Sequence, residues 1–234
     1  MESYVIYVKD NSFAQNGKQY LRESIKEHTP WLTLHDVPAI TEKSQIEKYM
    51  KDNSIVWNYP WRGVVQDFNT NLRKSAYITK DKFARISCAI MHYSLWKKVS
   101  ESNRPIFIFE HDAIFQCDMK ESVYDNLEAP IVGINSPYGA TRLPKKFDEY
   151  INKNKAKSTI VPAPKIDYDY IPQGLAGNSA YYITPDGGKI MLELVKKYGL
   201  WPNDALMCRQ LVPGLSVTKT YFTKVQGLPS LTTD

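Results

Sequence analysis

The run Ile-Phe-Ile-Phe at residues 106–109 constrains the fold more than any other part of the sequence. In an extended strand, successive side chains point to opposite faces, so four consecutive apolar residues make both faces apolar. Such a strand belongs inside a sheet that helices cover on both sides, as parallel strands of α/β proteins are covered. Residues 129–135, Ala-Pro-Ile-Val-Gly-Ile-Asn, indicate a second buried strand. We therefore expect an α/β fold with a mostly parallel central sheet flanked by helices.

Strands and helices are predicted to alternate along the rest of the chain. Further strands are expected at residues 4–8, 32–37, 178–183 and 216–222. Helices are expected around residues 20–25, 42–51, 84–102, 185–198 and 203–211. Residues 137–165 are polar and rich in lysine, which predicts a flexible basic connection. Because no repeat or linker divides the chain, we expect residues 1–234 to form one domain.

Several classes of protein are disfavoured by the composition. The longest apolar runs have the length of one strand, far short of the ~20 residues of a membrane helix. The first residues lead directly into a predicted strand, without a basic segment or a cleavage site. The three cysteines are too few and too scattered for a disulfide framework. We expect a cytoplasmic protein, free or peripheral to a membrane, with a viral protein in the host cytoplasm as a further setting.

Two acidic residues directly follow the run at 106–109. Glu110 and Asp112 flank His111 at the carboxyl end of the strand, the edge at which ligands bind in open α/β sheets. In extended backbone, these two carboxylates point to the same side, where they are able to share Mg²⁺ or Mn²⁺ with a nucleotide diphosphate. His111 then points to the other side and is not a metal ligand. A Glu-x-Asp pair alone is weakly specific, so the surrounding sequence has to decide whether Glu110 and Asp112 form a metal site.

That context resembles glycosyltransferase family 25, whose pattern is a Gly-Cys-x-x-Ser-His-x-x-Leu-Trp helix followed by an apolar strand ending in Glu-Asp-Asp. The matching residues, in order and spacing, are Cys88, His92, Leu95, Trp96, Glu110 and Asp112. Residues 177–188 are similar to the family's Gly-Thr-His-Ala-Tyr-Leu-Ile segment. Residues 201–204 stand at its Pro-x-Asp element. The resemblance covers roughly residues 84–210 and departs from the family at the middle acid, here His111, and at Asn178-Ser179, here in place of Thr-His.

The resemblance implies a single GT-A-like domain that transfers a sugar from a nucleotide-sugar, usually a UDP-sugar, to a hydroxyl group. It implies that Glu110 and Asp112 hold Mn²⁺ or Mg²⁺. It also implies contacts to the donor or substrate from His92, His111, Asn178 and Ser179. Whether the transfer inverts or retains the sugar configuration stays open. An inverting transfer needs a general base, for which Asp204 is the first candidate, ahead of Asp167 and Asp169.

Two acceptors remain open: a saccharide such as a lipooligosaccharide core, and a hydroxymethylated base in DNA. Aromatic and basic residues suited to either acceptor are Trp57, Trp61, Arg62, Arg73 and Lys74. A metal-dependent phosphodiesterase or nuclease using Glu110, His111 and Asp112 is an alternative function. Another is a sugar-nucleotide-binding protein without turnover, which the replacement of the middle acid by His111 keeps open.

Overall fold

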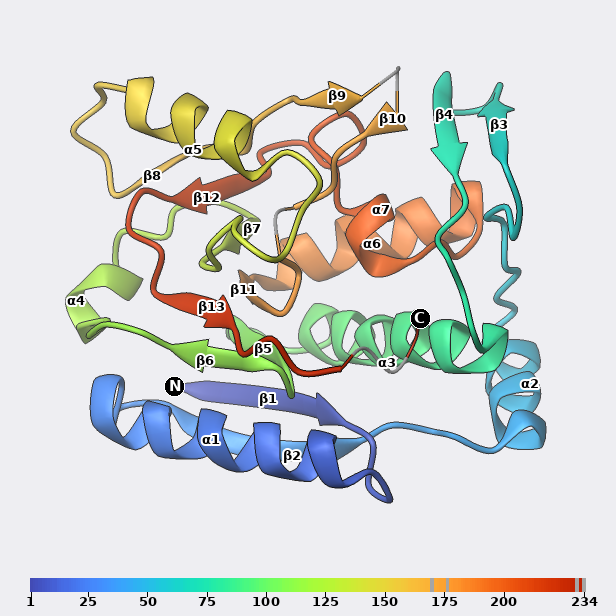
Figure 1. The fold of residues 1–234 in the computed structure, drawn as a ribbon, viewed down its shortest axis with the longest axis horizontal. Coiled ribbons are helices and arrows are strands. Elements are labelled where there is room, and N and C mark those ends of the chain that lie inside the picture. The colour runs from blue at the N-terminus through green and yellow to red at the C-terminus, as the bar shows by residue number, and fades with distance from the viewer. Residues whose placement is uncertain (169–170, 176, 230–231, 233–234) are drawn as a thin grey trace.

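The computed structural model describes residues 1–168, 171–175, 177–229 and 232. Its main sheet is built from β1 (Glu2–Tyr7), β2 (Thr33–Pro38), β5 (Ile106–Glu110), β7 (Ile131–Gly133), β8 (Ile160–Pro162), β11 (Ala180–Ile183) and β12 (Ser216–Thr218). The strands lie in the order β2-β1-β5-β11-β7-β12-β8 (Figure 1). Strands β2, β1, β5, β7 and β12 share one direction, whereas β11 and β8 run antiparallel to their neighbours. The predicted α/β class with a mostly parallel sheet is confirmed.

Shorter elements surround this sheet. Three two-stranded sheets are described, formed by β3 (Val64–Asp67) with β4 (Leu72–Ser75), β6 (Ala113–Phe115) with β13 (Thr223–Val225), and β9 (Asp167–Tyr168) with β10 (Ile171–Pro172). The helices are α1 (Ser12–His28), α2 (Lys43–Asp52), α3 (Lys82–Ser100), α4 (Glu121–Tyr124), α5 (Pro144–Lys153), α6 (Pro185–Tyr198) and α7 (Asn203–Leu206). No helix in the described part of the chain is long and apolar enough to cross a membrane.

Strand β5 buries both of its faces, as its apolar run predicts. Ile106 and Ile108 belong to the core cluster that includes residues of α3 and α6. Phe107 and Phe109 belong to the second cluster, which includes residues of α1. The alternation of side chains along one strand thus places a helical layer on each side of the sheet. Figure 1 shows α1 along one side of the sheet and α3 and α6 along the other.

Helices α3 and α6 lie in direct contact. This contact fixes the position of α3, which carries Cys88 and His92. A Cβ atom at Gly188 would lie 2.6 Å from the carbonyl oxygen of Trp96, so only glycine allows this approach. Helix α6 starts as the sequence predicts. The side chain of Thr184 accepts a hydrogen bond from the backbone N–H of Gly187, and Pro185 occupies the first helical turn.

The stretch at residues 137–165, predicted as a flexible basic connection, contains regular secondary structure. Helix α5 and strand β8 lie within it, and β8 pairs with β12 at the edge of the main sheet. Phe147 and Ile151, four residues apart on α5, are buried and attach the otherwise polar helix to the body of the protein. Two buried apolar residues in ten are a weak signal in a lysine-rich stretch.

Candidate active site

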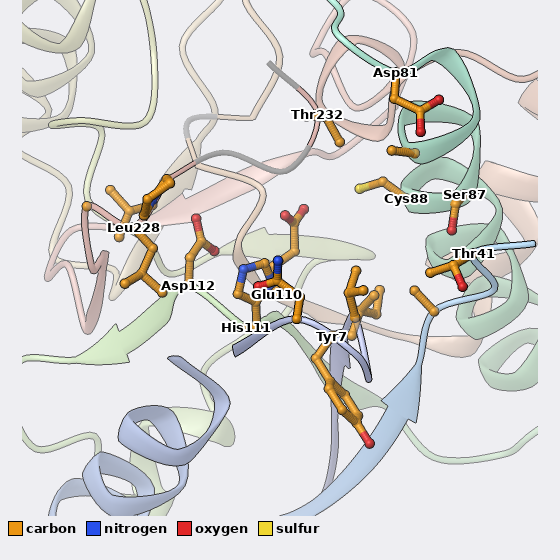
Figure 2. A pocket seen from close by; sticks show the side chains of 18 of the residues that line it. Tyr7, Thr41, Asp81, Ser87, Cys88, Glu110, His111, Asp112, Leu228 and Thr232 are labelled. Atoms are coloured by element: carbon orange, nitrogen blue, oxygen red, sulfur yellow. The ribbon is translucent and has the colours of Figure 1, made fainter. Parts of the chain in front are cut away.

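A pocket of about 430 Å³ opens at the carboxyl ends of β1 and β5 (Figure 2). Its lining comes from the end of β1, from α3, from the turn after β5, and from the C-terminal segment that follows β13. Glu110, His111 and Asp112 all line it, and Cys88 of α3 faces them. The pocket therefore lies at the edge of the sheet where the sequence predicts a ligand site.

Glu110 is held by two neighbours. Nε2 of His92 lies 3.0 Å from Oε1 of Glu110, and Nδ2 of Asn203 donates to the same oxygen at 3.3 Å. Burial by itself would raise the pKa of Glu110, but the hydrogen bonds from His92 and Asn203 oppose this effect, and the pKa is lowered. Glu110 is thus maintained as a carboxylate. Because His92 is fully buried, it acts on the site through Glu110, which corrects the prediction that it contacts the donor.

A chain of hydrogen bonds continues behind His92. Trp96 Nε1 donates to the hydroxyl oxygen of Tyr181 at 2.9 Å, and that hydroxyl lies 2.9 Å from Nδ1 of His92. With the imidazole hydrogen on Nε2, Tyr181 donates to Nδ1 and His92 donates to Glu110, so every polar hydrogen in the chain has an acceptor. The neutral His92 tautomer with its hydrogen on Nε2 therefore satisfies all of these hydrogen bonds, which run from α3 through β11 to the end of β5.

Asp112 is much less well satisfied. Residues 111–112 form a turn, so the expectation of an extended Glu-His-Asp segment, with His111 on the opposite side, is wrong. Burial and the charge of Glu110 raise the pKa of Asp112 to about 7, and the side chain of Ser179 opposes this shift by hydrogen bonding. Oδ1 of Asp112 is buried without a hydrogen-bond partner in the described residues.

These features fit a divalent cation at Glu110 and Asp112. An oxygen-rich site with a buried, unpartnered carboxylate atom suits a hard ion such as Mg²⁺ or Mn²⁺. A second group of ligand atoms, from Cys88, His92 and Glu110, lies within 4.8 Å. It is less suited to a metal, because both ring nitrogens of His92 have partners and because burial and nearby acids raise the pKa of the Cys88 thiol well above its ordinary value.

Asn178 and Ser179 lie where the antiparallel strand β11 approaches the end of β5. The backbone N–H of Glu110 donates to the carbonyl of Ser179 at 2.8 Å. The side chain of Asn178 is 5% exposed, and neither its oxygen nor its nitrogen has a partner among the described residues. A buried amide without partners is costly unless a ligand completes its hydrogen bonds, so the structure keeps Asn178 as a candidate contact.

Asp204 lies at the start of α7 and lines a second, smaller pocket. The hydroxyl of Tyr77 donates to Oδ2 of Asp204 at 2.9 Å. Burial raises the pKa of Asp204, although Tyr77 and Arg85 oppose the shift. The neighbouring Asn203 donates a hydrogen bond to Glu110 in the larger pocket, whereas Asp204 lines the smaller one. Two consecutive residues therefore contact the two pockets. The side chain of Asp167 and all of Asp169 lie outside the described residues.

The residues predicted to bind the acceptor are placed elsewhere. Within the described residues, neither pocket is lined by Trp57, Trp61, Arg62, Arg73 or Lys74. Trp57 and Trp61 stack on each other, with ring centroids 4.9 Å apart. Lys74 and Asp67 form an ion pair at 2.8 Å with side chains only 5% and 4% exposed. Lys74 is therefore part of the protein interior, which corrects its prediction as an acceptor contact.

Gln226 is a further residue of the site that the sequence did not indicate. Its side-chain amide donates to the carbonyls of Gly17, His111 and Ala113, and its backbone N–H donates to the carbonyl of Asp112. The C-terminal segment thereby holds the turn that carries Asp112. A glutamine near the end of a sequence carries no local signal for such a role.

The fold and this pocket define an α/β enzyme with paired carboxylates at the ligand-binding edge of its sheet. The profile of glycosyltransferase family 25, described as LPS biosynthesis protein, matches residues 14–207. The chain belongs to this family and is a glycosyltransferase, as the sequence resemblance indicated. Comparison with curated proteins gave no significant match.

Solved structures of two glycosyltransferases are also similar to the chain. The galactosyltransferase LgtC, in complex with donor and acceptor sugar analogues, is 10% identical with a TM-score of 0.47, covering 98% of this chain and 88% of that chain. Mouse xyloside xylosyltransferase 1, in its apo form, is 11% identical with a TM-score of 0.46, covering 88% of this chain and 81% of that chain. The family assignment rests on the profile match.

The first test removes the hydroxyl of Tyr181. Tyr181→Phe leaves the buried N–H of Trp96 and Nδ1 of His92 without their partner, so we expect a loss of about 1–3 kcal/mol in the free energy of unfolding, measured with urea. Tyr182→Phe is the matched control, because the neighbouring Tyr182 hydroxyl has no hydrogen-bond partner among the described residues. An equal loss of unfolding free energy in both variants would contradict the role of the Tyr181 hydroxyl in the hydrogen bonds to Trp96 and His92.

The second test uses the raised pKa of Asp112 in protein freed of metal with EDTA. The folded protein binds this proton more tightly than the unfolded chain does, so its contribution to stability is present below about pH 4 and lost as the pH rises through about 7. Asp112→Asn removes that loss. We expect the variant to be more stable than the wild type at pH 8 and equally stable at pH 4, whereas exposed Asp10→Asn should differ at neither pH.

Proposed function

We propose that the enzyme transfers a sugar from a UDP-sugar to a hydroxyl group of a saccharide, with Mn²⁺ or Mg²⁺ held by Glu110 and Asp112. One observation carries this proposal: the half-buried carboxylates of Glu110 and Asp112 both line a pocket of about 430 Å³, and Oδ1 of Asp112 is buried without a partner among the described residues. The pocket has the size of a small-molecule site, and a divalent cation bound to a diphosphate would offset both carboxylate charges.

The residues around the two carboxylates have separate tasks in this mechanism. When bound, the cation stabilises the negative charge of the departing diphosphate. His92 and Asn203 keep Glu110 charged and in position, and Ser179 orients Asp112. Asn178 offers a buried amide whose nitrogen and oxygen have no partner among the residues described, and we assign it to a hydroxyl of the donor. The chain's own hydrogen bonds thus prepare the site before the donor arrives.

Asp204 is the proposed base of an inverting transfer. Its raised pKa makes its carboxylate a stronger proton acceptor, and its small pocket adjoins the larger one through Asn203. The positions of Trp57 and Trp61 argue against a flipped DNA base as acceptor, because the two rings stack on each other instead of lining a pocket. Family membership favours transfer over the phosphodiesterase and non-catalytic alternatives.

The donor and the metal are tested by thermal unfolding with a panel of nucleoside diphosphates and nucleotide-sugars. With UDP and Mn²⁺ at about 100 times Kd, we expect a rise of about 5–10 °C in Tm for a chain of this length. The rise should disappear with EDTA and in Asp112→Asn, and it should persist in Asp10→Asn. A rise with UDP that is equally large in EDTA would contradict a metal-dependent donor site.

The role of Asp204 is tested with Asp204→Asn. Because the amide cannot accept the proton of the acceptor hydroxyl, kcat should fall by about 10²–10⁴ while the Kd for UDP-sugar with Mn²⁺ stays nearly unchanged. A joint loss of donor binding and turnover would instead make Asp204 part of the metal site. Unchanged turnover would remove Asp204 from the chemistry and direct the search for a base to Asp167 and Asp169.

A further inference from the structure

The smaller pocket beside the active site has its own lining and a volume of about 100 Å³. A single turn separates it from the donor pocket, since Gly139 lines the larger pocket whereas Thr141 and Arg142 line the smaller one. Helix α7 joins the two pockets in the same way, through Asn203 on one side and Asp204 on the other. A ligand in the smaller pocket would therefore lie next to a donor in the larger one.

The inner part of the smaller pocket is polar. Asp204 accepts a hydrogen bond from Tyr77, and Gln173 accepts one from the hydroxyl of Thr141 at 3.1 Å. Gln173 is buried, and no described residue accepts a hydrogen bond from the N–H groups of its side-chain amide. The rings of Tyr59 and Tyr77 stack with centroids 5.9 Å apart and line the same space. A carboxylate, amide donors and tyrosine rings together suit a ligand with several hydroxyl groups.

Arg142 adds a positive charge at the rim. Its side chain is exposed, and its guanidinium carbon lies 5.9 Å from the centre of the Tyr77 ring. Among the residues that the structure describes, no carboxylate forms an ion pair with Arg142. Guanidinium groups bind carboxylates and phosphates through paired hydrogen bonds, so an arginine without an acidic partner beside a polar pocket suits an anionic substituent.

Other ligand classes fit this pocket less well. Its volume is less than a quarter of that of the donor pocket, which disfavours a second nucleotide. Asp204 is the single acid in its described lining and Arg142 is close by, which disfavours a divalent cation. The polar lining disfavours an apolar molecule. A sugar unit with a negative substituent at its edge remains the ligand that uses all of these groups.

We propose that this pocket binds the acceptor sugar and that Arg142 selects an acceptor with an anionic substituent, a carboxylate or a phosphate. The inference rests on the proposed function, because the acceptor has to lie beside a donor. In this arrangement Gln173 and Asp204 receive the hydroxyl groups of the sugar, and Arg142 binds the anion at the rim. Arg142 is a specificity residue, and the transfer step does not require its charge.

The test measures sugar binding by ligand-observed NMR in the presence of UDP and Mn²⁺. Galactose, galacturonate and galactose 6-phosphate differ at one substituent, and the corresponding glucose series covers the other common ring configuration. We expect at least one anionic sugar to bind the wild type about five- to tenfold more tightly than its neutral counterpart. In Arg142→Gln the preference should fall to within about twofold. Lys146→Gln, an exposed lysine four residues away that lines neither pocket, should retain it.

Each result has a defined meaning. A preference for the carboxylate alone or the phosphate alone supports the inference and identifies the anion. The inference is wrong if no anionic sugar binds the wild type more tightly than its neutral counterpart, or if the preference survives in Arg142→Gln. Binding of UDP with Mn²⁺ is measured on the same samples and should be equal in all three proteins. If UDP binds normally while the anionic preference is absent, only this inference falls; if UDP does not bind, the proposed function falls.

Discussion

The charges of Glu110 and Asp112 are the constraint around which this part of the molecule is arranged. Removing a carboxylate from water costs several kcal/mol unless hydrogen bonds or an opposite charge offset the loss. The protein does this for one of the two: His92 and Asn203 bind Glu110, whereas Asp112 has the hydroxyl of Ser179 and retains a buried oxygen that has no partner in the described part of the chain. A bound cation would remove this asymmetry. The residues that bind the two carboxylates come from helix α3, from the start of β11 and from helix α7, which all meet at the end of β5.

Much of the fold follows from local sequence patterns. The run at residues 106–109 places β5 inside the sheet, and Thr184 with Pro185 marks the start of α6, because each feature depends on neighbouring residues alone. The pairing of β13 with β6 and the position of β8 at the sheet edge depend on residues about 50 to 110 positions apart in sequence. No local period encodes such pairings, so the helix and the edge strand within residues 137–165 are not evident from the sequence.

The residues of the site also differ in whether a local sequence pattern identifies them. Glu110 and Asp112 were predicted because they directly follow a strand and match a family pattern. Tyr181, Asn203 and Gln226 look like ordinary core or loop residues in the sequence. They gain their roles because the fold brings them to His92, to Glu110 and to the turn after β5, respectively. Lys74 illustrates the opposite error. A lysine in a basic stretch suggests an anion contact, yet its pairing with the buried Asp67 is visible only in three dimensions.

Helix α7 connects Glu110 in the donor pocket to the proposed base, Asp204, through two adjacent residues of the backbone. Asn203 donates to Glu110 and Asp204 lines the neighbouring pocket, so their separation is set by one peptide unit instead of by flexible side chains. Gly174 packs directly against α7, because a Cβ atom at this position would overlap the carbonyl oxygen of Asp204. A displacement of α7 would therefore change the support of Glu110 and the position of the base together. In the proposed mechanism, such coupling would keep the acceptor hydroxyl and the donor aligned, which is the geometric condition for a direct displacement at the sugar.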